Sequence, residues 1–395
     1  MNDPGHSWAA EWDLSRRYNF NHGSLGFTPK AVLARKEALD RKLNAGREEF
    51  IREGGFKDIE NARKVLAEFL GADEQDFVLT VNITEAINSV LKSLSLGPGD
   101  DVLITSHMYS SYPAMIGELA RRQGFGIVVA DIPYAPASDD EIVSAVTGAV
   151  TANTKLAIIE HITSPTALIF PVQNIVAALK ERGVDTFIDG AHAPGQVPVN
   201  LNQIGAAYYG GNNHKWLCAP LSSGFLHVRR DKQADIIPAI GSVLSVASQP
   251  FTERFSWQGV IDYSPRLMIP DVLQTMAGFH PDGWDGIYRR NHELAVAARV
   301  KLGARLGIKL PVSDDMIGAM FTLPLGNPVF SDAEKAKSEL HRGYDYMVET
   351  CGYGVIFSRF QNQYLVRVTC HLYNCLNDYD VLADGLDRFM KDHSG

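Results

Sequence analysis

An acid and a lysine, Asp189 and Lys215, are the residues of this chain whose types and surroundings are best suited to catalysis. Asp189 ends the apolar run 184–188, and Lys215 stands in the glycine- and asparagine-rich run 210–216. An acid at the tip of a buried strand can keep a pyridine nitrogen protonated, and a lysine in a nearby turn can form a Schiff base with an aldehyde. The pair therefore predicts a pyridoxal 5'-phosphate (PLP) enzyme, which acts on the bonds at or next to the Cα of an amino acid.

Each residue of this pair also has a simpler explanation, in which Lys215 is a surface lysine and Asp189 caps a turn. The flanking His214 and Trp216 favour a partly buried Lys215. Burial lowers the pKa of a lysine, and the neutral amine can attack an aldehyde and later move the Cα proton as a general base. His192 is expected near the phenolic oxygen of the cofactor ring, although a histidine satisfied within its loop would explain it equally well.

A phosphate site is expected where a helix begins after the first apolar run. Residues 82–94 have the apolar spacing of a helix whose first turn contains Ile83 and Thr84. The backbone amides of this turn and the positive end of the helix dipole suit a phosphate group, to which the Thr84 hydroxyl can add a hydrogen bond. The alternative is an ordinary helix start that Thr84 caps for itself.

Two further residues are candidates for contacts with the ring and the substrate. Tyr109 offers a flat face for stacking on the ring and a hydroxyl that could serve as a second acid or base, and His107 is the alternative for both roles. Arg367 lies within the apolar run 365–369, where a cation needs a partner. Its planar fork fits the α-carboxylate of an amino acid, and the alternative is a structural ion pair.

The elements that must position these residues alternate between short apolar runs and helical patterns. This alternation is typical of an α/β fold with a mostly parallel, doubly wound sheet. The predicted strands lie at 77–81, 101–105, 126–130, 155–159, 184–188 and 224–228. Ligands bind at the carboxyl ends of such strands, and the polar candidates stand at those ends. They are residues 82, 84, 107, 109, 161, 163, 164, 189 and 192.

We expect three regions along the chain: an N-terminal arm (1–30), a large PLP-binding domain (31–265) and a smaller α+β C-terminal domain (266–395). The large domain would begin with helical structure over 30–70. The small domain would contain helices at 286–306 and 378–390 and strands at 320–324 and 364–369.

The composition excludes several other classes of protein. The 395 residues are 45% hydrophobic and 21% charged, which is ordinary for a globular protein. A net charge of -9 without a lysine/arginine block argues against nucleic acid or an anionic membrane as a partner. No apolar run approaches the roughly 20 residues of a membrane-spanning helix. The four cysteines show no CxxC spacing, so we expect a reduced, cytoplasmic protein without a metal site.

Taken together, the motifs resemble the class V aminotransferase family of fold type I PLP enzymes, and most of all its isopenicillin N epimerase-like and cysteine C–S lyase-like members. The resemblance runs nearly end to end. Its segments are 21–26 (NHGSLG), 49–53 (EFIRE), 82–86 (NITEA), 161–166 (HITSPT), 189–192 (DGAH), 214–220 (HKWLCAP), 257–259 (WQG), and Arg367 with 371–374 (HLYN).

The resemblance implies a homodimer with shared active sites, and it extends the set of expected site residues. Thr84, Asn212 and His214 would help bind the phosphate, and Ser164 would contact the cofactor. Gly259 would come from the partner subunit. The substrate pocket would be lined by Asn21, His22, Gly23 and Ser24.

The chain departs from the family pattern at three places. Val260 replaces a threonine, Leu221-Ser222 replaces lysine-glycine, and Ala167 replaces a glycine. These changes argue against assuming the epimerase substrate and suggest a specialised branch in secondary metabolism.

Three reactions on an L-α-amino acid fit these residues. The first is Cα deprotonation by Lys215 with loss of a β-substituent, as in a C–S lyase acting on an S-substituted L-cysteine. The others are epimerisation at Cα and decarboxylative or oxidative deamination. A desulfurase is disfavoured because the stretch 358–363 before Arg367 holds no cysteine and Cys351 lies ahead of a strand. A non-enzymatic binding or regulatory module with this fold is disfavoured, because such a module would not need Lys215.

Overall fold

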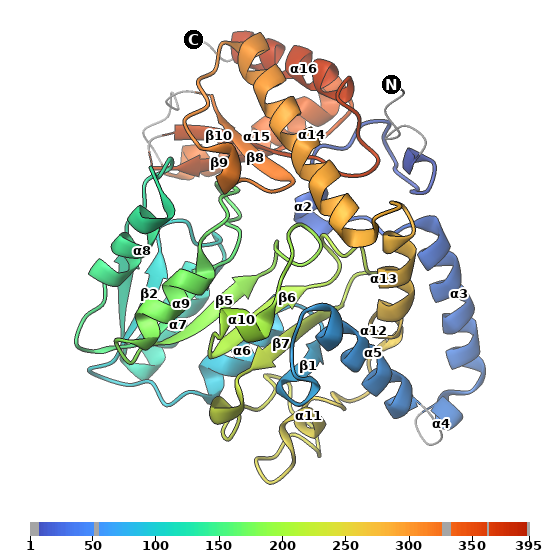
Figure 1. Ribbon diagram of the computed structural model, residues 1–395, viewed down its shortest axis with the longest axis vertical. Coiled ribbons are helices and arrows are strands. Elements are labelled where there is room, and N and C mark those ends of the chain that lie inside the picture. The colour runs from blue at the N-terminus through green and yellow to red at the C-terminus, as the bar shows by residue number, and fades with distance from the viewer. Residues whose placement is uncertain (1–7, 51–54, 326–332, 362, 393–395) are drawn as a thin grey trace.

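The computed structural model describes residues 8–50, 55–325, 333–361 and 363–392, and it is built around a seven-stranded sheet (Figure 1). The strand order is β1-β7-β6-β5-β4-β2-β3, and all strands run parallel except β7, which is antiparallel to both neighbours. The bounds are β1 (Phe77–Thr80), β2 (Asp101–Thr105), β3 (Gly126–Ala130), β4 (Thr154–Glu160), β5 (Asp185–Gly190), β6 (Tyr208–Asn212) and β7 (Gly224–Val228).

Both faces of this sheet are covered by helices, because successive strand residues point to opposite sides. In β4, Leu156 and Ile158 enter one core, and Ala157 and Ile159 enter the other. The first core is covered by α6 (Ile83–Ser93), α7 (Tyr112–Gln123) and α11 (Phe251–Arg254). The second is covered by α5 (Gly55–Phe69), α8 (Asp139–Gly148), α9 (Val172–Lys180), α10 (Leu201–Ile204) and α13 (Ile269–Ala277). The α/β, doubly wound prediction is confirmed.

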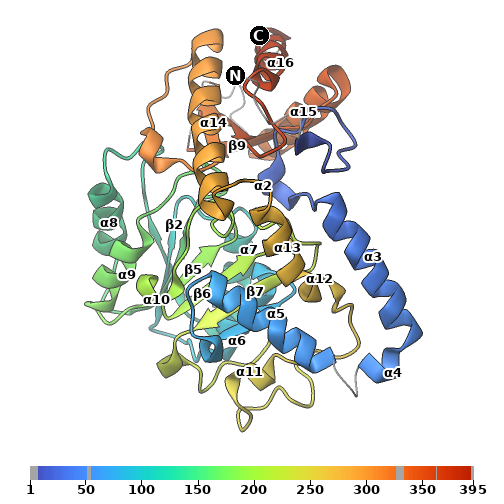
Figure 2. The same cartoon turned by 45° about the vertical axis from the view of Figure 1, so that its right-hand side comes forward.

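A smaller antiparallel sheet with the order β8-β10-β9 lies beyond the carboxyl end of the large sheet, in orange and red in Figure 1. Its strands are β8 (Met320–Pro324), β9 (Ile356–Phe360) and β10 (Gln363–Thr369). It is accompanied by α14 (Gly283–Leu306), α15 (Ala333–Cys351) and α16 (Asp378–Asp392). The long helix α14 runs from this sheet down to the large one (Figure 2).

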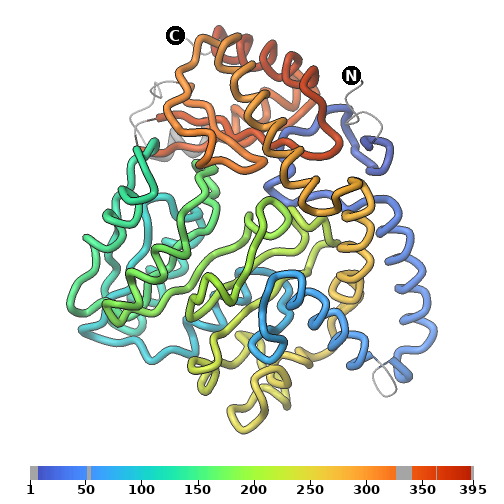
Figure 3. Tube along the Cα trace, in the orientation of Figure 1, coloured from blue at the N-terminus to red at the C-terminus, as the bar shows by residue number. Residues whose placement is uncertain are grey.

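The N-terminal segment returns to the small sheet and forms part of the wall between the two sheets (Figure 3). The Phe20 carbonyl accepts a hydrogen bond from the Thr369 amide at 3.0 Å, which places α2 (His22–Leu25) beside the end of β10. From there α3 (Lys30–Ala45) and α4 (Arg47–Glu49) run along the outside of the molecule. The remaining elements are α12 (Ser264–Leu267) and the short 3-10 turns at Glu74–Asp76, Arg230–Lys232 and Asp314–Met316.

The structure differs from the predicted elements in several places, and helix α15 and strand β9 were not predicted. Strand β6 was not predicted, because Gly210-Gly211 followed by two asparagines favours a turn. The helical region 30–70 is divided into α3, α4 and α5. Residues 358–360 belong to β9 and Gln363 begins β10, so most of the stretch 358–363 lies in strands and not in a loop.

Candidate active site

A cavity of about 190 Å³ lies at the carboxyl ends of β4, β5 and β6, where the first turn of α6 also points. Most predicted site residues line it, although they come from distant parts of the sequence. These are Ser24, Ile83, Thr84, Tyr109, Ser164, Asp189, His192, Asn212, His214 and Lys215. The topology of a parallel sheet therefore brings the chemistry together where the sequence predicted it.

Lys215 is half-buried at the cavity wall, and burial, together with the nearby charge of Arg367, lowers its pKa to about 7. Its Nζ lies 3.2 Å from Nε2 of His192. The Trp216 indole donates to Nδ1 of the same ring at 3.3 Å. Burial holds the pKa of His192 well below its usual range, so this ring is neutral and its one proton is on Nε2. His192 therefore donates to the lone pair of a neutral Lys215 amine.

Asp189 is 4% exposed at the end of β5, and one carboxylate oxygen accepts the Ala191 amide at 2.8 Å. Within the described part of the chain no lysine, arginine or histidine forms an ion pair with it. Burial raises the pKa of Asp189, so the carboxylate is in need of a positive partner. A protonated pyridine nitrogen fits that requirement.

Only some of the hydrogen-bond donors in the first turn of α6 are available to an anion. Asn82 caps the helix by accepting the Glu85 amide at 2.9 Å, so Thr84 is not the cap. The Ile83 amide donates to the Asn212 side chain at 3.0 Å and is not free for a phosphate. Thr84 is exposed at the cavity wall, and its own amide and hydroxyl have no partner in the described structure. Thr84 thus provides two donors for a phosphate group, and Asn212 orients the turn.

His214 lines the same side of the cavity, and its Nδ1 is buried without a hydrogen-bond partner among the described atoms. Burial lowers the pKa of His214 to about 4, so the ring is neutral. A neutral imidazole has one proton, which His214 can donate either to the backbone of Ser223 or to a phosphate oxygen.

Of the two candidates for stacking on the ring, Tyr109 lines the cavity and His107 does not. Tyr109 is 43% exposed and lines the wall. His107 is fully buried, with its two nitrogens bonded to the Thr166 hydroxyl at 2.6 Å and the Ile132 carbonyl at 3.0 Å. Its ring packs against Phe360 with a centroid distance of 4.2 Å. The structure therefore removes His107 from the candidates for stacking and for proton transfer.

Arg367 is buried in the middle of β10 and has only neutral partners. Its guanidinium donates to the carbonyl and hydroxyl of Ser164, at 2.8 and 2.9 Å, and to the Ser24 hydroxyl at 3.1 Å. Its Nε has no partner among the described residues, and no carboxylate there pairs with it. Burial lowers the pKa of Arg367 to about 10. The alternative of a structural ion pair is therefore wrong, and the side chain is suited to an incoming carboxylate.

The N-terminal residues divide between the cavity and the layer behind it. Ser24 lines the wall, and its hydroxyl donates to the Asn21 side chain at 2.7 Å. Gly23 is buried where a Cβ would meet the Met320 sulfur at 3.1 Å. The structure therefore places Gly23 and Asn21 in support of Ser24.

His22 belongs to a buried polar layer behind Lys215. Its ring lies 3.0 Å from the Lys215 carbonyl and 2.9 Å from the Tyr373 hydroxyl. The ring stacks on His371 at 3.9 Å, and Cys218 lies 3.7 and 3.5 Å from the Nε2 atoms of the two rings. These atoms lie within 4.8 Å of one another, but the lone pairs of two stacked rings are nearly parallel and do not converge on one metal ion. This layer fixes the backbone of Lys215.

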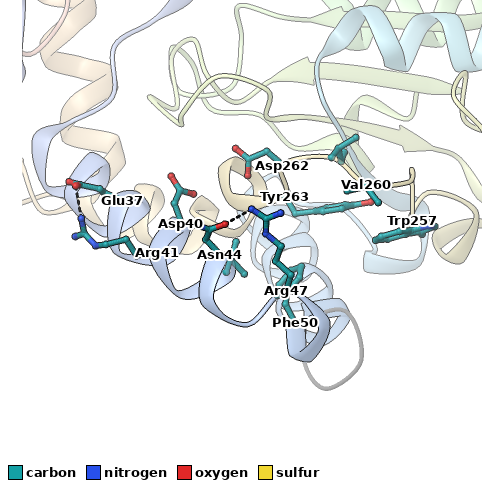
Figure 4. Close-up of a pocket in the computed structure, with 12 residues that line it drawn as sticks. Glu37, Asp40, Arg41, Asn44, Arg47, Phe50, Trp257, Val260, Asp262 and Tyr263 are labelled. Atoms are coloured by element: carbon teal, nitrogen blue, oxygen red, sulfur yellow. Dashed lines mark hydrogen bonds and ion pairs between the residues drawn. The ribbon is translucent and has the colours of Figure 1, made fainter.

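Gly259 does not line the cavity of its own chain. It lies beside an outer groove of about 610 Å³, formed by α3, α4 and residues 257–263 (Figure 4). Trp257, Tyr263 and Phe50 form apolar walls of this groove, and Val260 stands at its edge. The contribution of Gly259 to the partner's site stays a prediction.

Two titratable cavity residues were not identified from the sequence, Glu160 and Tyr112. Glu160 ends β4 as Asp189 ends β5, so the signal that marked Asp189, an acid directly after an apolar run, was available for it too. Tyr112 is 3% exposed, and its hydroxyl has no hydrogen-bond partner among the described atoms.

Comparisons with known proteins identify the family of this chain. The family model "Aminotransferase class-V" matches residues 17–259. An isopenicillin N epimerase from Amycolatopsis lactamdurans is 30% identical over 94% of this chain and 95% of its own. An L-cysteine desulfhydrase from Arabidopsis thaliana is 29% identical over 94% of this chain and 87% of its own. Among solved structures, the cystine C–S lyase C-DES aligns with a TM-score of 0.79 and 17% identity, over 94% of this chain and 97% of that one.

No helix in the described residues is long and apolar enough to cross a membrane. The family match covers more than half of the sequence and includes Asp189 and Lys215. The chain therefore belongs to the aminotransferase class-V family and is an enzyme whose cofactor is PLP.

Proposed function

We propose that this enzyme is a C–S lyase that removes the sulfur substituent of an S-substituted L-cysteine by β-elimination. The observation that carries the proposal is a pair of groups: the Lys215 amine at the cavity wall, whose pKa is lowered to about 7, and the buried Arg367, which contacts the cavity residues Ser24 and Ser164 and has no anionic partner in the described structure. Lys215 can take a proton from Cα. Arg367 can bind the α-carboxylate and thereby fix the orientation of Cα.

The residues divide the work of this reaction. When bound, PLP withdraws electrons from Cα and so makes its proton acidic. Arg367 binds the carboxylate, and Lys215 Nζ takes the proton while His192 keeps the amine oriented. Loss of the proton is followed by cleavage of the Cβ–S bond, and the sulfur leaves as a thiol with one proton. Water then releases ammonia and pyruvate.

Elimination needs one base next to Cα, and the site provides Lys215. Epimerisation is the second candidate, because it needs a proton donor on the opposite face and the exposed Tyr109 stands at the cavity wall. The relatives include enzymes named for each chemistry, L-cysteine desulfhydrase and isopenicillin N epimerase. Decarboxylative or oxidative deamination is a third outcome, in which the bond lost would be the one from Cα to the carboxylate that Arg367 is expected to bind.

A persulfide-forming desulfurase is disfavoured by the cysteines. None of the four lines the cavity, and three are buried. Burial raises the pKa of Cys351 and raises the pKa of Cys370 to about 12, so neither is an activated thiolate.

The shared-site homodimer is part of this proposal. Several large apolar side chains are exposed near Gly259, with Val260 91%, Val243 81% and Ile240 60% exposed. Exposed apolar groups of this kind mark a surface for association. None of the four cysteines forms a disulfide, which supports a reducing, cytoplasmic location. We assign the reaction to secondary metabolism, such as antibiotic biosynthesis, because Val260, Leu221 and Ala167 depart from the family pattern.

The test is proton NMR in deuterated water with the PLP-loaded protein and a panel of S-substituted L-cysteines. Pyruvate together with a released thiol is expected. Exchange of the Cα proton without breakdown would establish the epimerase instead, and an aldehyde without pyruvate would point to decarboxylation. Lys215→Ala is the matched control, and product formation by that variant would remove Lys215 from its role as the base.

A further inference from the structure

Two buried carboxyl groups stand side by side at the floor of the cavity. Glu160 at the end of β4 is in register with Asp189 at the end of β5, and both line the cavity. They are 2% and 4% exposed. Only Asp189 has an evident task, at the pyridine nitrogen. A second negative charge beside it would be costly in a buried site unless one of the two groups holds a proton.

The hydrogen bonds of Glu160 can be satisfied by a neutral carboxylic acid as well as by a carboxylate. One oxygen accepts the Tyr109 backbone amide at 2.8 Å, and the other lies 3.1 Å from the Thr105 hydroxyl. An amide can only donate, whereas a hydroxyl can donate or accept. A protonated carboxyl has one acceptor oxygen and one O–H donor, which this pair of partners satisfies. No cation in the described structure forms an ion pair with Glu160.

The charges around the pair favour a proton on Glu160 rather than on Asp189. Burial and the neighbouring Asp189 raise the pKa of Glu160 to about 8. The pKa of Asp189 is raised by burial but is held down by the Ala191 amide and by Lys215 across the cavity. Tyr109 reaches Glu160 only through its backbone amide.

We propose that Glu160 is a positioning residue that works as a neutral carboxylic acid. It holds the backbone of Tyr109, and thereby the ring that stacks on the cofactor, and it leaves Asp189 as the only negative charge at the pyridine nitrogen. The proposal rests on the roles of Tyr109 and Asp189 in the proposed function. Glu160 itself touches neither Cα nor the leaving group.

The variants Glu160→Gln and Glu160→Ala separate hydrogen bonding from charge. Glutamine reproduces the acceptor for Tyr109 and the donor for Thr105 without any charge, so the dissociation constant for PLP should stay within about twofold of the native value. Alanine leaves the Tyr109 amide without its partner and should weaken PLP binding by roughly tenfold. Asp189→Asn is the matched control for the other member of the pair, and it should weaken binding more than Glu160→Ala.

Two readouts report the charge directly. The infrared spectrum of the native protein should contain a protonated-carboxyl C=O band that Glu160→Gln removes. The visible absorbance of bound PLP should be the same in native protein and Glu160→Gln below the pKa of about 8, and differ above it. If Glu160→Gln behaved like Glu160→Ala, or the infrared band were absent, Glu160 would be an ionised group and the proposal would be overturned.

These measurements need no turnover, so they separate this inference from the proposed reaction. PLP binding that does not change in Glu160→Ala would remove the positioning role while leaving the lyase proposal standing. A thermal melt of each variant without PLP shows whether it folds. If Glu160→Ala does not fold, Glu160→Gln and the infrared band decide the question.

Discussion

His192 lies between Trp216 and Lys215 and fixes the protonation of the lysine through its own tautomer. Trp216 donates to Nδ1 at 3.3 Å, and Nε2 faces Nζ of Lys215 at 3.2 Å. Because the indole can only donate, the ring proton is placed on the side of Lys215, where it favours a neutral amine. The tryptophan next to the catalytic lysine thus contributes to its reactivity without touching it.

The rate at which the protein without cofactor captures PLP should follow this protonation. Below the Lys215 pKa of about 7 the amine is charged, so the rate should fall about tenfold for each unit of pH, and above it the rate should level off. Trp216→Phe frees the ring to accept from a charged lysine, so the plateau should begin at higher pH. Stopped-flow absorbance measures both profiles, and an unchanged profile in Trp216→Phe would contradict the tautomer argument.

Burial of Lys215 should also reduce stability in the absence of PLP. The pKa is about 7 in the folded protein and higher when unfolded, so folding requires loss of a proton or burial of a charge. The cost is complete below the folded pKa and disappears as the pH rises to the unfolded value. Lys215→Met should therefore stabilise the protein by about 2 kcal/mol below pH 7, with the gain shrinking at alkaline pH. Urea unfolding at several pH values tests this, and a gain that grows with pH would show the wrong sign.

Arg367→Lys should impair substrate binding more than chemistry. A lysine keeps the positive charge but cannot make the two parallel hydrogen bonds of the guanidinium. It would also lose the hydrogen bond to Ser164 or the one to Ser24. KM should rise by at least about tenfold while kcat falls less, a loss of roughly 2 kcal/mol in kcat/KM. Steady-state kinetics provides the measurement. Ser24→Ala, which removes one neutral partner, is the control and should have the smaller effect.

The large sheet and much of the site could be predicted because the signals are local. An apolar run that ends in a polar residue marks both a strand and its carboxyl end, and this pattern located Asp189 and Tyr109. Strand β6 was missed because its local signal is misleading: Gly210 and Gly211 have low strand propensity. Glycine fits at these positions because a bulkier residue would clash there. A Cβ at Gly210 would meet the Ile83 side chain at 2.4 Å.

The positions that could not be predicted depend on contacts between distant segments. Glu160 carries the same local signal as Asp189, but its place beside Asp189 depends on β4 and β5 being neighbours in register. His22 was predicted to line the substrate pocket. Its ring instead contacts the Tyr373 hydroxyl and the Lys215 carbonyl, which hold it in the layer behind the cavity. His107 is likewise drawn into the interior by Thr166 and Phe360.

Two departures from the family pattern should differ in their effect on stability. Ser222 and Ala167 stand where the family has glycine, and both have a left-handed backbone, with φ of 70° and 60°. Replacement by glycine would relieve roughly 1–2 kcal/mol of backbone strain in the folded protein. It would also cost about 0.4–1 kcal/mol of stability, because glycine raises the conformational entropy of the unfolded chain. Exposed Ser222→Gly should therefore stabilise by about 0.5–1 kcal/mol. Ala167→Gly also loses a buried methyl worth about 0.8 kcal/mol and should be near neutral.

Thermal unfolding of the two variants checks this difference. Ala157→Gly in β4 is the control, because it removes a buried methyl group where the backbone is extended, and it should destabilise. Equal gains from Ser222→Gly and Ala167→Gly would show that the Ala167 methyl contributes nothing to packing.

The shared-site homodimer can be tested by mixing two inactive variants. Gly259 has φ of 83°, a conformation that aspartate tolerates, and a Cβ there meets no atom within 4 Å in its own chain. Gly259→Asp should therefore fold, but it would place a negative charge beside the phosphate in the partner's cavity. Lys215→Ala lacks the base. In a mixed dimer, one site combines an intact Lys215 with an intact Gly259 from the other chain.

Random exchange of subunits makes half of the dimers mixed, and each of these has one complete site. Equal amounts of Gly259→Asp and Lys215→Ala should therefore recover about a quarter of the native activity, although each alone is nearly inactive. The recovery should be absent if Gly259 serves its own chain, because every chain in the mixture would then carry one defect in its own site. Mixing each variant with itself under the same exchange conditions is the control for activity gained by dilution and reassociation alone.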